Sequence, residues 1–299
     1  MNLEALPFHR AAPMNPEEVV LLLADEYSRM AETYDRNVTP HFAPIAERVL
    51  RAADPKPGEM FLDLGTGTGL LACLVAPKVA PQSVVAIDLA DGALAAATYR
   101  AAGLGIRSIR FEMMDVRNIV YRGGLFDAVV SNLGIPYFGT DRCFRETARV
   151  VKPTGRFVFS EWGEFTDPPQ DALMAALNRH RNPDPPKKLA EVRAASEFAR
   201  SSDAVKGLRD PKRATDLLKA AGFRRVEVEV VRHRAVFTPP EAYLNFRLSW
   251  GVFEAEVAGM SPASREAFRT EMTRELRSLA KGKDLEAQWL LHLYSARPQ

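Results

Sequence analysis

The stretch FLDLGTGTGL, which runs from Phe61 to Leu70, decides the fold of this chain. A short apolar run ends in Asp63, and three glycines follow at alternate positions, namely Gly65, Gly67 and Gly69. A glycine-rich turn between a strand and a helix lets the backbone approach a ligand closely, because no Cβ is in the way. The stretch therefore predicts a strand, a ligand-binding turn and a helix.

Short β-rich runs alternate with helical segments after this stretch. The strand-like runs lie at 60–64, 83–89, 108–114, 126–133 and 156–162, and the helical segments lie at 70–80, 90–103 and 141–151. Apolar strands separated by helices indicate a mostly parallel sheet that helices cover on both faces. We therefore expect an α/β protein of the doubly wound class.

Further helical segments flank this core. Residues 16–35 place apolar side chains at helical spacing, and these are Val20, Leu23, Ala24, Tyr27, Met30, Ala31 and Tyr34. Beyond Trp162 the alternation breaks, and helical insertions lie before and after the strand-like run at 224–237. Open α/β sheets bind ligands at the carboxyl ends of their strands, so we expect the insertions to act as lids.

The composition is that of an ordinary globular protein. The chain has 299 residues, 46% of them hydrophobic and 26% charged, which favours one large domain over two. A net charge of +2 is too small to predict a nucleic-acid surface. With only Cys73 and Cys143, we expect neither a disulfide framework nor a metal site. Because there is no signal-like start and no run of about 18 apolar residues, we expect a cytoplasmic protein without a membrane span.

The glycine spacing distinguishes between two kinds of ligand. Dinucleotide enzymes typically carry GxGxxG, whereas this chain carries GxGxG, which disfavours a nicotinamide oxidoreductase. Asp88 ends the second strand-like run, some 23 residues beyond Gly65, where a carboxylate can accept hydrogen bonds from a ribose. Asp115 follows the third run, in position to accept a hydrogen bond from an adenine amine.

Five segments, taken in this order, resemble the class I S-adenosylmethionine-dependent methyltransferases: FLDLGTGTG, VVAIDLA, MMDV, FDAVVSNLGI and RVVKPTGRFVF. The likeness is closest to the group of the ubiquinone and menaquinone biosynthesis methyltransferases, and it covers roughly residues 31–161. It implies a seven-stranded, Rossmann-like sheet whose last strand is antiparallel. The chain departs from the group at Thr154, where a second glycine is usual, and in NLGIPYF, where histidines are frequent. The substrate class therefore stays open.

The resemblance implies S-adenosylmethionine as the cofactor and S-adenosylhomocysteine as the product. The residues that it assigns to cofactor binding are Tyr34, Asp63, Gly65, Thr66, Gly67, Gly69, Asp88, Leu89, Asp115, Val116, Asn132 and Leu133. Among these, Asp63 would reach the ammonium group, Asp88 the ribose hydroxyls and Asp115 the adenine amine. Asn132 and Leu133 would run beside the sulfonium.

Methyl transfer from a sulfonium is an in-line displacement, and alignment can lower its barrier by on the order of 7 to 11 kcal/mol. A general base would be useful if the acceptor is a hydroxyl. The histidines are His9, His41, His180, His233 and His292, and we interpret the last two as ordinary strand residues. The sequence therefore assigns no catalytic residue.

Aromatic residues near the strand ends are candidates for an apolar acceptor wall. Tyr137 and Trp162 follow strand ends directly, Tyr27 lies on the first helix, and Phe246 is expected in the core instead. We expect a small organic acceptor beneath a helical lid. The alternatives are an RNA or protein acceptor, and a non-catalytic subunit that binds the cofactor. A homodimer is compatible with the sequence.

The expected organisation is a single methyltransferase domain over 1–299. Its parts are an N-terminal helical cap at 1–52, a cofactor-binding core at 53–162, a lid insertion at 163–208, further sheet elements at 209–237 and 284–299, and a second helical insertion at 238–283.

Overall fold

Seven strands form one sheet in a computed structural model that describes residues 14–298, so His9 and the start of the expected cap lie outside the described residues. The strands are β1 (Phe61–Leu64), β2 (Val84–Asp88), β3 (Ile109–Met113), β4 (Phe126–Asn132), β5 (Val151–Trp162), β6 (Arg225–Phe237) and β7 (Leu285–Arg297). Their order across the sheet is β3-β2-β1-β4-β5-β7-β6. Strands β1 to β5 pair in parallel, and β7 is antiparallel to both neighbours. The predicted doubly wound sheet with an antiparallel last strand is confirmed.

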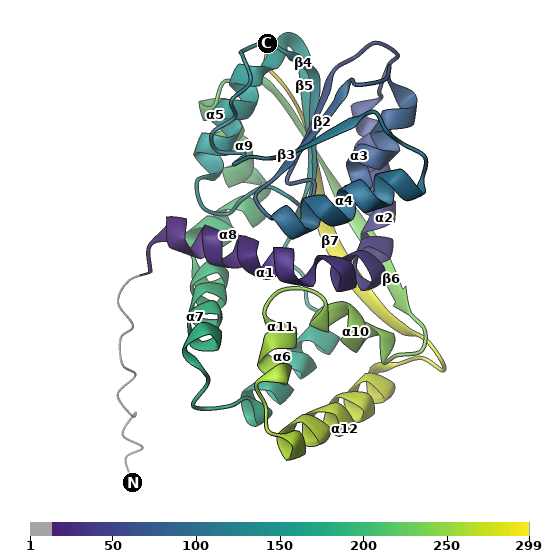
Figure 1. Ribbon diagram of the computed structural model, residues 1–299, viewed down its shortest axis with the longest axis vertical. Helices are drawn as coiled ribbons and strands as arrows, with labels where there is room; N and C mark the ends of the chain where they lie inside the picture. Colours follow the sequence, from purple (N-terminus) through teal and green to yellow (C-terminus); the bar gives the residue numbers. More distant parts are fainter. Residues whose placement is uncertain (1–13, 299) are drawn as a thin grey trace.

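Helices cover both faces of this sheet (Figure 1). One face carries α2 (Thr39–Ala53), α3 (Leu70–Val75) with the short η1 (Ala76–Lys78), and α4 (Asp91–Gly103), and the other carries α5 (Thr140–Val150), α8 (Asp203–Arg209) and α9 (Pro211–Ala220). Successive strand residues point to opposite faces, so Phe61 packs in one hydrophobic cluster while Leu62 and Leu64 pack in the other. Burial on both faces explains why the central strands read as continuous apolar runs.

The remaining helices gather at one end of the sheet. Helix α1 (Pro16–Asn37) crosses this end, and beyond it lie α6 (Pro168–His180), α7 (Lys187–Ser201), α10 (Ala242–Leu248), α11 (Phe253–Ala258) and α12 (Pro262–Leu279) (Figure 1). Helix α1 contacts α2 and α4 of the core as well as α7 and α10. It therefore lies between the sheet and the helices of the two insertions.

Residues expected to be structural lie in the core or the sheet. Phe246 is 1% exposed, Cys73 and Cys143 are buried free thiols, and His233 and His292 lie in β6 and β7, as predicted. Between Met14 and Pro298, no cluster of His, Cys, Asp and Glu is suited to hold a metal ion.

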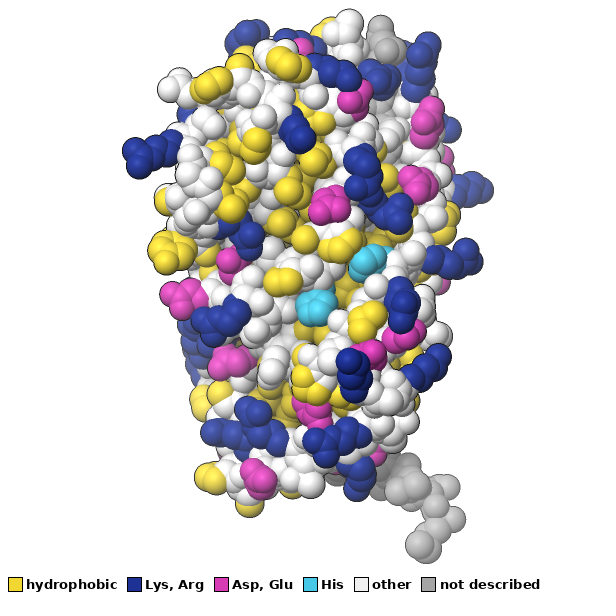
Figure 2. Space-filling model, turned by 90° about the vertical axis from the view of Figure 1, so that its right-hand side faces the viewer, with side chains coloured by type: hydrophobic (Ala, Val, Ile, Leu, Met, Phe, Trp, Pro, Cys, Tyr) yellow, Lys and Arg dark blue, Asp and Glu magenta, His cyan; other side chains and the backbone are white. Residues whose placement is uncertain are grey.

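Charged side chains of both signs lie on the surface of the molecule (Figure 2). On the face that Figure 2 shows, Lys and Arg side chains are spread widely and acidic side chains lie among them. No helix in the described part of the chain combines the length and the apolar character that a membrane crossing requires.

Candidate functional site

A cavity of about 320 Å³ lies at the carboxyl ends of the parallel strands, beneath α1. The predicted cofactor residues that line it are Tyr34, Asp63, Gly65, Thr66, Gly67, Asp88, Leu89, Asp115, Val116, Asn132 and Leu133. The three predicted acceptor residues, Tyr27, Tyr137 and Trp162, line the same cavity. The structure thus brings together side chains that are spread over more than a hundred positions of the sequence.

Gly69 is the predicted cofactor residue that does not line the cavity. It has φ of 77° and precedes α3, and a Cβ added there would lie 2.8 Å from the Cβ of Ala97 in α4. Gly69 therefore permits close packing between the turn and α4.

The other two glycines of the turn serve different purposes. Both have positive φ, 60° for Gly65 and 55° for Gly67. A Cβ on Gly65 would lie 2.5 Å from the carbonyl oxygen of Gly134, whereas a Cβ on Gly67 would meet no atom within 4 Å. Gly65 is thus required by the packing of two backbones, while Gly67 faces open space in the cavity wall.

Asp63 presents a buried oxygen that has no partner. The side chain is 1% exposed, and its Oδ2 accepts hydrogen bonds from the Thr66 hydroxyl (2.7 Å) and from the Ala72 N–H (3.1 Å). Oδ1 is buried without a partner. Burial raises the pKa of Asp63 to about 7, although the two hydrogen bonds oppose the rise. An unpaired buried acceptor is costly, so this oxygen fits a ligand that brings a donor, such as an ammonium group.

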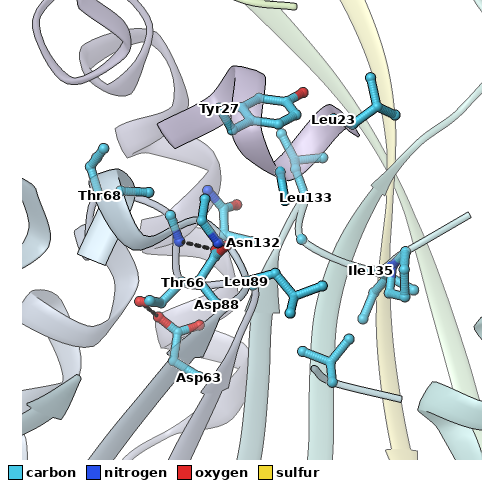
Figure 3. A pocket seen from close by; sticks show the side chains of 18 of the residues that line it. Leu23, Tyr27, Asp63, Thr66, Thr68, Asp88, Leu89, Asn132, Leu133 and Ile135 are labelled. Carbon is cyan, nitrogen blue, oxygen red and sulfur yellow. Dashed lines mark hydrogen bonds between the residues drawn. The ribbon is translucent and has the colours of Figure 1, made fainter. Parts of the chain in front are cut away.

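Asp88 ties the glycine turn to the end of β2. Its Oδ2 accepts a hydrogen bond from the Gly67 N–H (2.8 Å), and its Oδ1 accepts one from the Ala90 N–H (2.9 Å). Figure 3 shows this carboxylate near that of Asp63, with Tyr27 on the opposite side of the pocket. Each carboxylate oxygen has a second lone pair, so Asp88 can still accept hydrogen bonds from a diol. Burial raises the pKa of Asp88, against the effect of the backbone hydrogen bonds.

Ser160, which the sequence did not single out, positions the end of β4. Its Oγ donates to Oδ1 of Asn132 (2.9 Å) and accepts from the Leu133 N–H (3.1 Å). Leu133 has φ of 59°, a left-handed conformation that costs a non-glycine residue roughly 1–2 kcal/mol. The serine therefore helps to hold a strained backbone beside the cavity. A serine inside a β-strand gives no sequence signal for this role.

Arg117 is a second residue that the sequence analysis missed. It lines the cavity, and its guanidinium forms a fork with both oxygens of Asp115. Burial alone would raise the pKa of Asp115, but the Arg117 side chain and N–H hold it below its ordinary value. Asp115 therefore stays ionised, and Arg117 fixes the orientation of its carboxylate.

The apolar stripe of α1 faces the cavity as well as the core. Val20, Leu23, Ala24 and Tyr27 all line the cavity, and Leu21, on another side of the helix, is 62% exposed. The helical period correctly predicts one apolar face. It does not distinguish a core from a cavity, because both are apolar surroundings.

Aromatic rings from the end of β5 and from the helices form another wall of the cavity. The Trp250 Nε1–H donates to the Tyr27 hydroxyl (3.0 Å), and the Trp250 ring stacks on Trp162 at 5.7 Å between centroids. Phe42 packs edge-on against both tryptophans. This half of the cavity suits a flat, apolar molecule.

Two tyrosine hydroxyls near this wall, those of Tyr27 and Tyr137, can donate hydrogen bonds to a ligand. Burial raises the pKa of Tyr137, and the nearby Glu161 carboxylate raises it further. Burial also raises the pKa of Tyr27. Both hydroxyls are therefore neutral donors near pH 7. Histidine is absent from the described lining residues. The His41 ring packs at a tilt against Phe237, and the His180 ring nitrogen Nε2 lies 2.8 Å from Oε2 of Glu271.

Comparison with known proteins agrees with this geometry. A family model described as a methyltransferase domain matches residues 61–155. Nocamycin O-methyltransferase of Saccharothrix syringae is 27% identical, over 88% of this chain and 94% of its own length. A demethylmenaquinone methyltransferase of Clavibacter sepedonicus is 31% identical, over 59% of this chain and 70% of its own length.

Solved structures share the fold. The YcgJ protein of Bacillus subtilis aligns with a TM-score of 0.51 at 16% identity, over 85% of this chain and 98% of that chain. Phosphoethanolamine N-methyltransferase 2 of Haemonchus contortus, solved with S-adenosyl-L-methionine, aligns with a TM-score of 0.51 at 20% identity, over 86% of this chain and 53% of that chain. The ordered motifs, the sheet topology and the sequence relatives agree, and the chain belongs to the class I S-adenosylmethionine-dependent methyltransferase family.

Proposed function

We propose that this chain transfers a methyl group from S-adenosylmethionine to a small organic molecule that is enclosed between the strand ends and α1. One observation carries the proposal: the cavity joins a polar half, with Asp63 and Asp88, to an apolar half that α1 and the tryptophans enclose. When bound, S-adenosylmethionine supplies a methyl group on a positively charged sulfur, which is already activated for transfer.

The residues of the chain would bind and orient this cofactor. The free Oδ1 of Asp63 would accept a hydrogen bond from the ammonium group, Asp88 would accept from the ribose hydroxyls, and Asp115 would accept from the adenine amine. Asn132 and Leu133 place no formal charge at the end of β4, where the resemblance puts the sulfonium. Gly69 has no contact role in this proposal, because it packs on α4.

The acceptor half of the cavity would exclude water and align the nucleophile. Its wall consists of α1 side chains and of Trp162 and Trp250, with Tyr27 and Tyr137 as hydrogen-bond donors. Since both tyrosines stay protonated near pH 7, the site suits an acceptor that is already nucleophilic. The names of two relatives, for nocamycin and demethylmenaquinone, support a small organic acceptor. We propose that the insertions at 163–208 and 238–283 act as lids over it.

Two measurements test the function in order. Calorimetric titration with S-adenosylhomocysteine should show saturable binding, and its absence at millimolar ligand would rule out the proposed cofactor. Methyl-labelled S-adenosylmethionine should then label quinols, phenols or carboxylic acids in a small-molecule panel. Label that appears only in RNA or protein substrates would instead establish the macromolecular alternative.

The affinity for S-adenosylhomocysteine is expected to rise by about tenfold or more between about pH 5.5 and 7.5, because Asp63, with a pKa of about 7, must ionise to pair with the ammonium. The free energy of unfolding of the ligand-free protein depends on pH in the opposite direction. Because the pKa of Asp63 is higher in the folded protein than in the unfolded chain, this carboxyl stabilises the fold most at acidic pH, and its contribution is lost as the pH rises toward about 7. Calorimetry across this range measures the affinity. The Asp63→Asn variant should bind weakly and with a flat pH profile, and a flat profile in the wild type would contradict the role of Asp63.

A further inference from the structure

A single guanidinium joins the adenine end of the cavity to the first turn of α1. The Nε of Arg117 lies 3.0 Å from each oxygen of Asp115, and its Nη2 lies 2.7 Å from Oδ2 of the same carboxylate. The same Nη2 lies 2.7 Å from Oε2 of Glu17, which is on α1. The chain of contacts is therefore Asp115, Arg117 and Glu17. Glu17 has a second, more exposed partner, because its Oε1 lies 3.4 Å from Nη1 of Arg142 on α5.

Arg117 is held rigidly at this junction. Its side chain is 6% exposed, and a Cβ on Gly139 would lie 2.7 Å from the Arg117 Cδ, so Gly139 makes room for the arginine stem. The planar fork of an arginine fixes the orientation of a carboxylate, which an ammonium group does not. Arg117 thus determines where the oxygens of Asp115 point.

One other ion pair of α1, between Asp35 and Arg100 of α4, is also partly buried, with the two side chains 30% and 21% exposed. Two further pairs are more exposed. Lys188 pairs with Asp25 at 3.1 Å, and Arg29 pairs with Glu254 at 3.4 Å, with substantial exposure on both sides of each pair. Exposed pairs contribute little to stability. Arg117 lines the cavity and Arg100 does not, so the pair with Arg117 is the ion pair of α1 best placed to report events in the cavity to the helix.

The position of α1 determines the acceptor wall. Val20, Leu23 and Tyr27 follow Glu17 on the same helix, and all three line the cavity. We call α1 docked when it lies across the end of the sheet, as it does in this structure (Figure 1). A ligand that contacts both Asp115 and α1 binds the protein more tightly when α1 is docked than when α1 has moved away. By linkage, it also stabilises the docked position.

We propose that Arg117 and Glu17 are positioning residues that make the acceptor wall depend on the cofactor. The adenine held at Asp115 stabilises the docked position of α1 through Arg117 and Glu17, and the docked helix completes the acceptor site. The proposal rests on the proposed function, because it places an adenosyl ligand at Asp115. Its kinetic consequence is ordered binding, in which the cofactor precedes the acceptor.

Amide hydrogen exchange of residues 16–27, with and without S-adenosylhomocysteine, tests this coupling. In the wild type the ligand should slow exchange over this segment. In Glu17→Gln the ligand-induced slowing should fall by about half or more, and the dissociation constant should rise by about two- to tenfold. Arg117→Lys should behave in the same way, since lysine cannot form the fork.

Glu18→Gln is the matched control, because Glu18 is an exposed acid on the same turn and has no ion-pair partner among residues 14–298. It should retain the wild-type ligand effect. Unchanged slowing in Glu17→Gln, or an equal loss in Glu18→Gln, would overturn the coupling. Failure of the wild type to bind S-adenosylhomocysteine would instead contradict the proposed function. Glu17 is 52% exposed, so its replacement should leave the fold intact.

Discussion

Replacement of Asp88 by alanine is expected to weaken the binding of S-adenosylhomocysteine by about 100-fold or more. Hydrogen bonds to a charged group contribute about 1.5–3 kcal/mol each, and the proposed ribose contact has two of them. The substitution also removes the acceptor for the N–H groups of Gly67 and Ala90, which loosens the turn that carries the ligand. Calorimetric titration at pH 7.5 measures the loss.

Two companion variants separate these effects. Asp88→Asn keeps one acceptor oxygen but lacks the charge, so we expect an intermediate loss of roughly tenfold. Asp141→Ala removes an exposed carboxylate from α5, away from the cavity lining, and should bind as the wild type does. Wild-type affinity in a folded Asp88→Ala protein would show that the ribose does not lie against this carboxylate.

The polar half of the site was predictable because its residues are close in sequence to the strand ends. Asp63 and Asp88 each lie at or near the end of a strand, and the carboxyl ends of parallel strands meet at one edge of the sheet. Tyr137 and Trp162 follow the same rule and also line the cavity. Spacing along the chain thus translates directly into proximity wherever the parallel sheet provides the frame.

The missed residues depend on contacts between segments that no local pattern relates. Arg117 acts through Glu17, a hundred positions earlier, and their meeting depends on where α1 crosses the sheet. Ser160 acts through its register beside Asn132, and a serine in a strand is ordinary. The apolar period of α1 identifies a face but not its neighbour, so the sequence could not predict that this face would enclose a cavity.

The three glycines of the turn illustrate the same limit. The sequence shows three glycines at alternate positions and does not distinguish them, and in the structure all three have positive φ. Their neighbours differ: a Cβ on Gly65 meets the backbone of Gly134, a Cβ on Gly69 meets Ala97, and a Cβ on Gly67 meets no atom within 4 Å. Only the packed structure assigns them different functions.

Gly65→Ala and Gly67→Ala should therefore fail in different ways. Both carry the cost of a left-handed alanine, roughly 1–2 kcal/mol. Gly65→Ala adds a contact of 2.5 Å with the Gly134 carbonyl oxygen, and neither backbone can move without shifting the ends of β1 and β4. We expect a total loss of about 3 kcal/mol or more, seen as a fall of roughly 5 °C or more in melting temperature.

Gly67→Ala should melt only about 2–3 °C below the wild type, because its methyl group meets open space. That space is part of the cavity, and the proposed methionine portion of the ligand lies there. The affinity for S-adenosylhomocysteine should therefore fall by more than about tenfold while the protein remains folded. Thermal melts and calorimetry on the same samples separate the two outcomes. Wild-type stability in Gly65→Ala would contradict the backbone contact with Gly134, and wild-type affinity in Gly67→Ala would mean that the ligand does not cross the turn at Gly67.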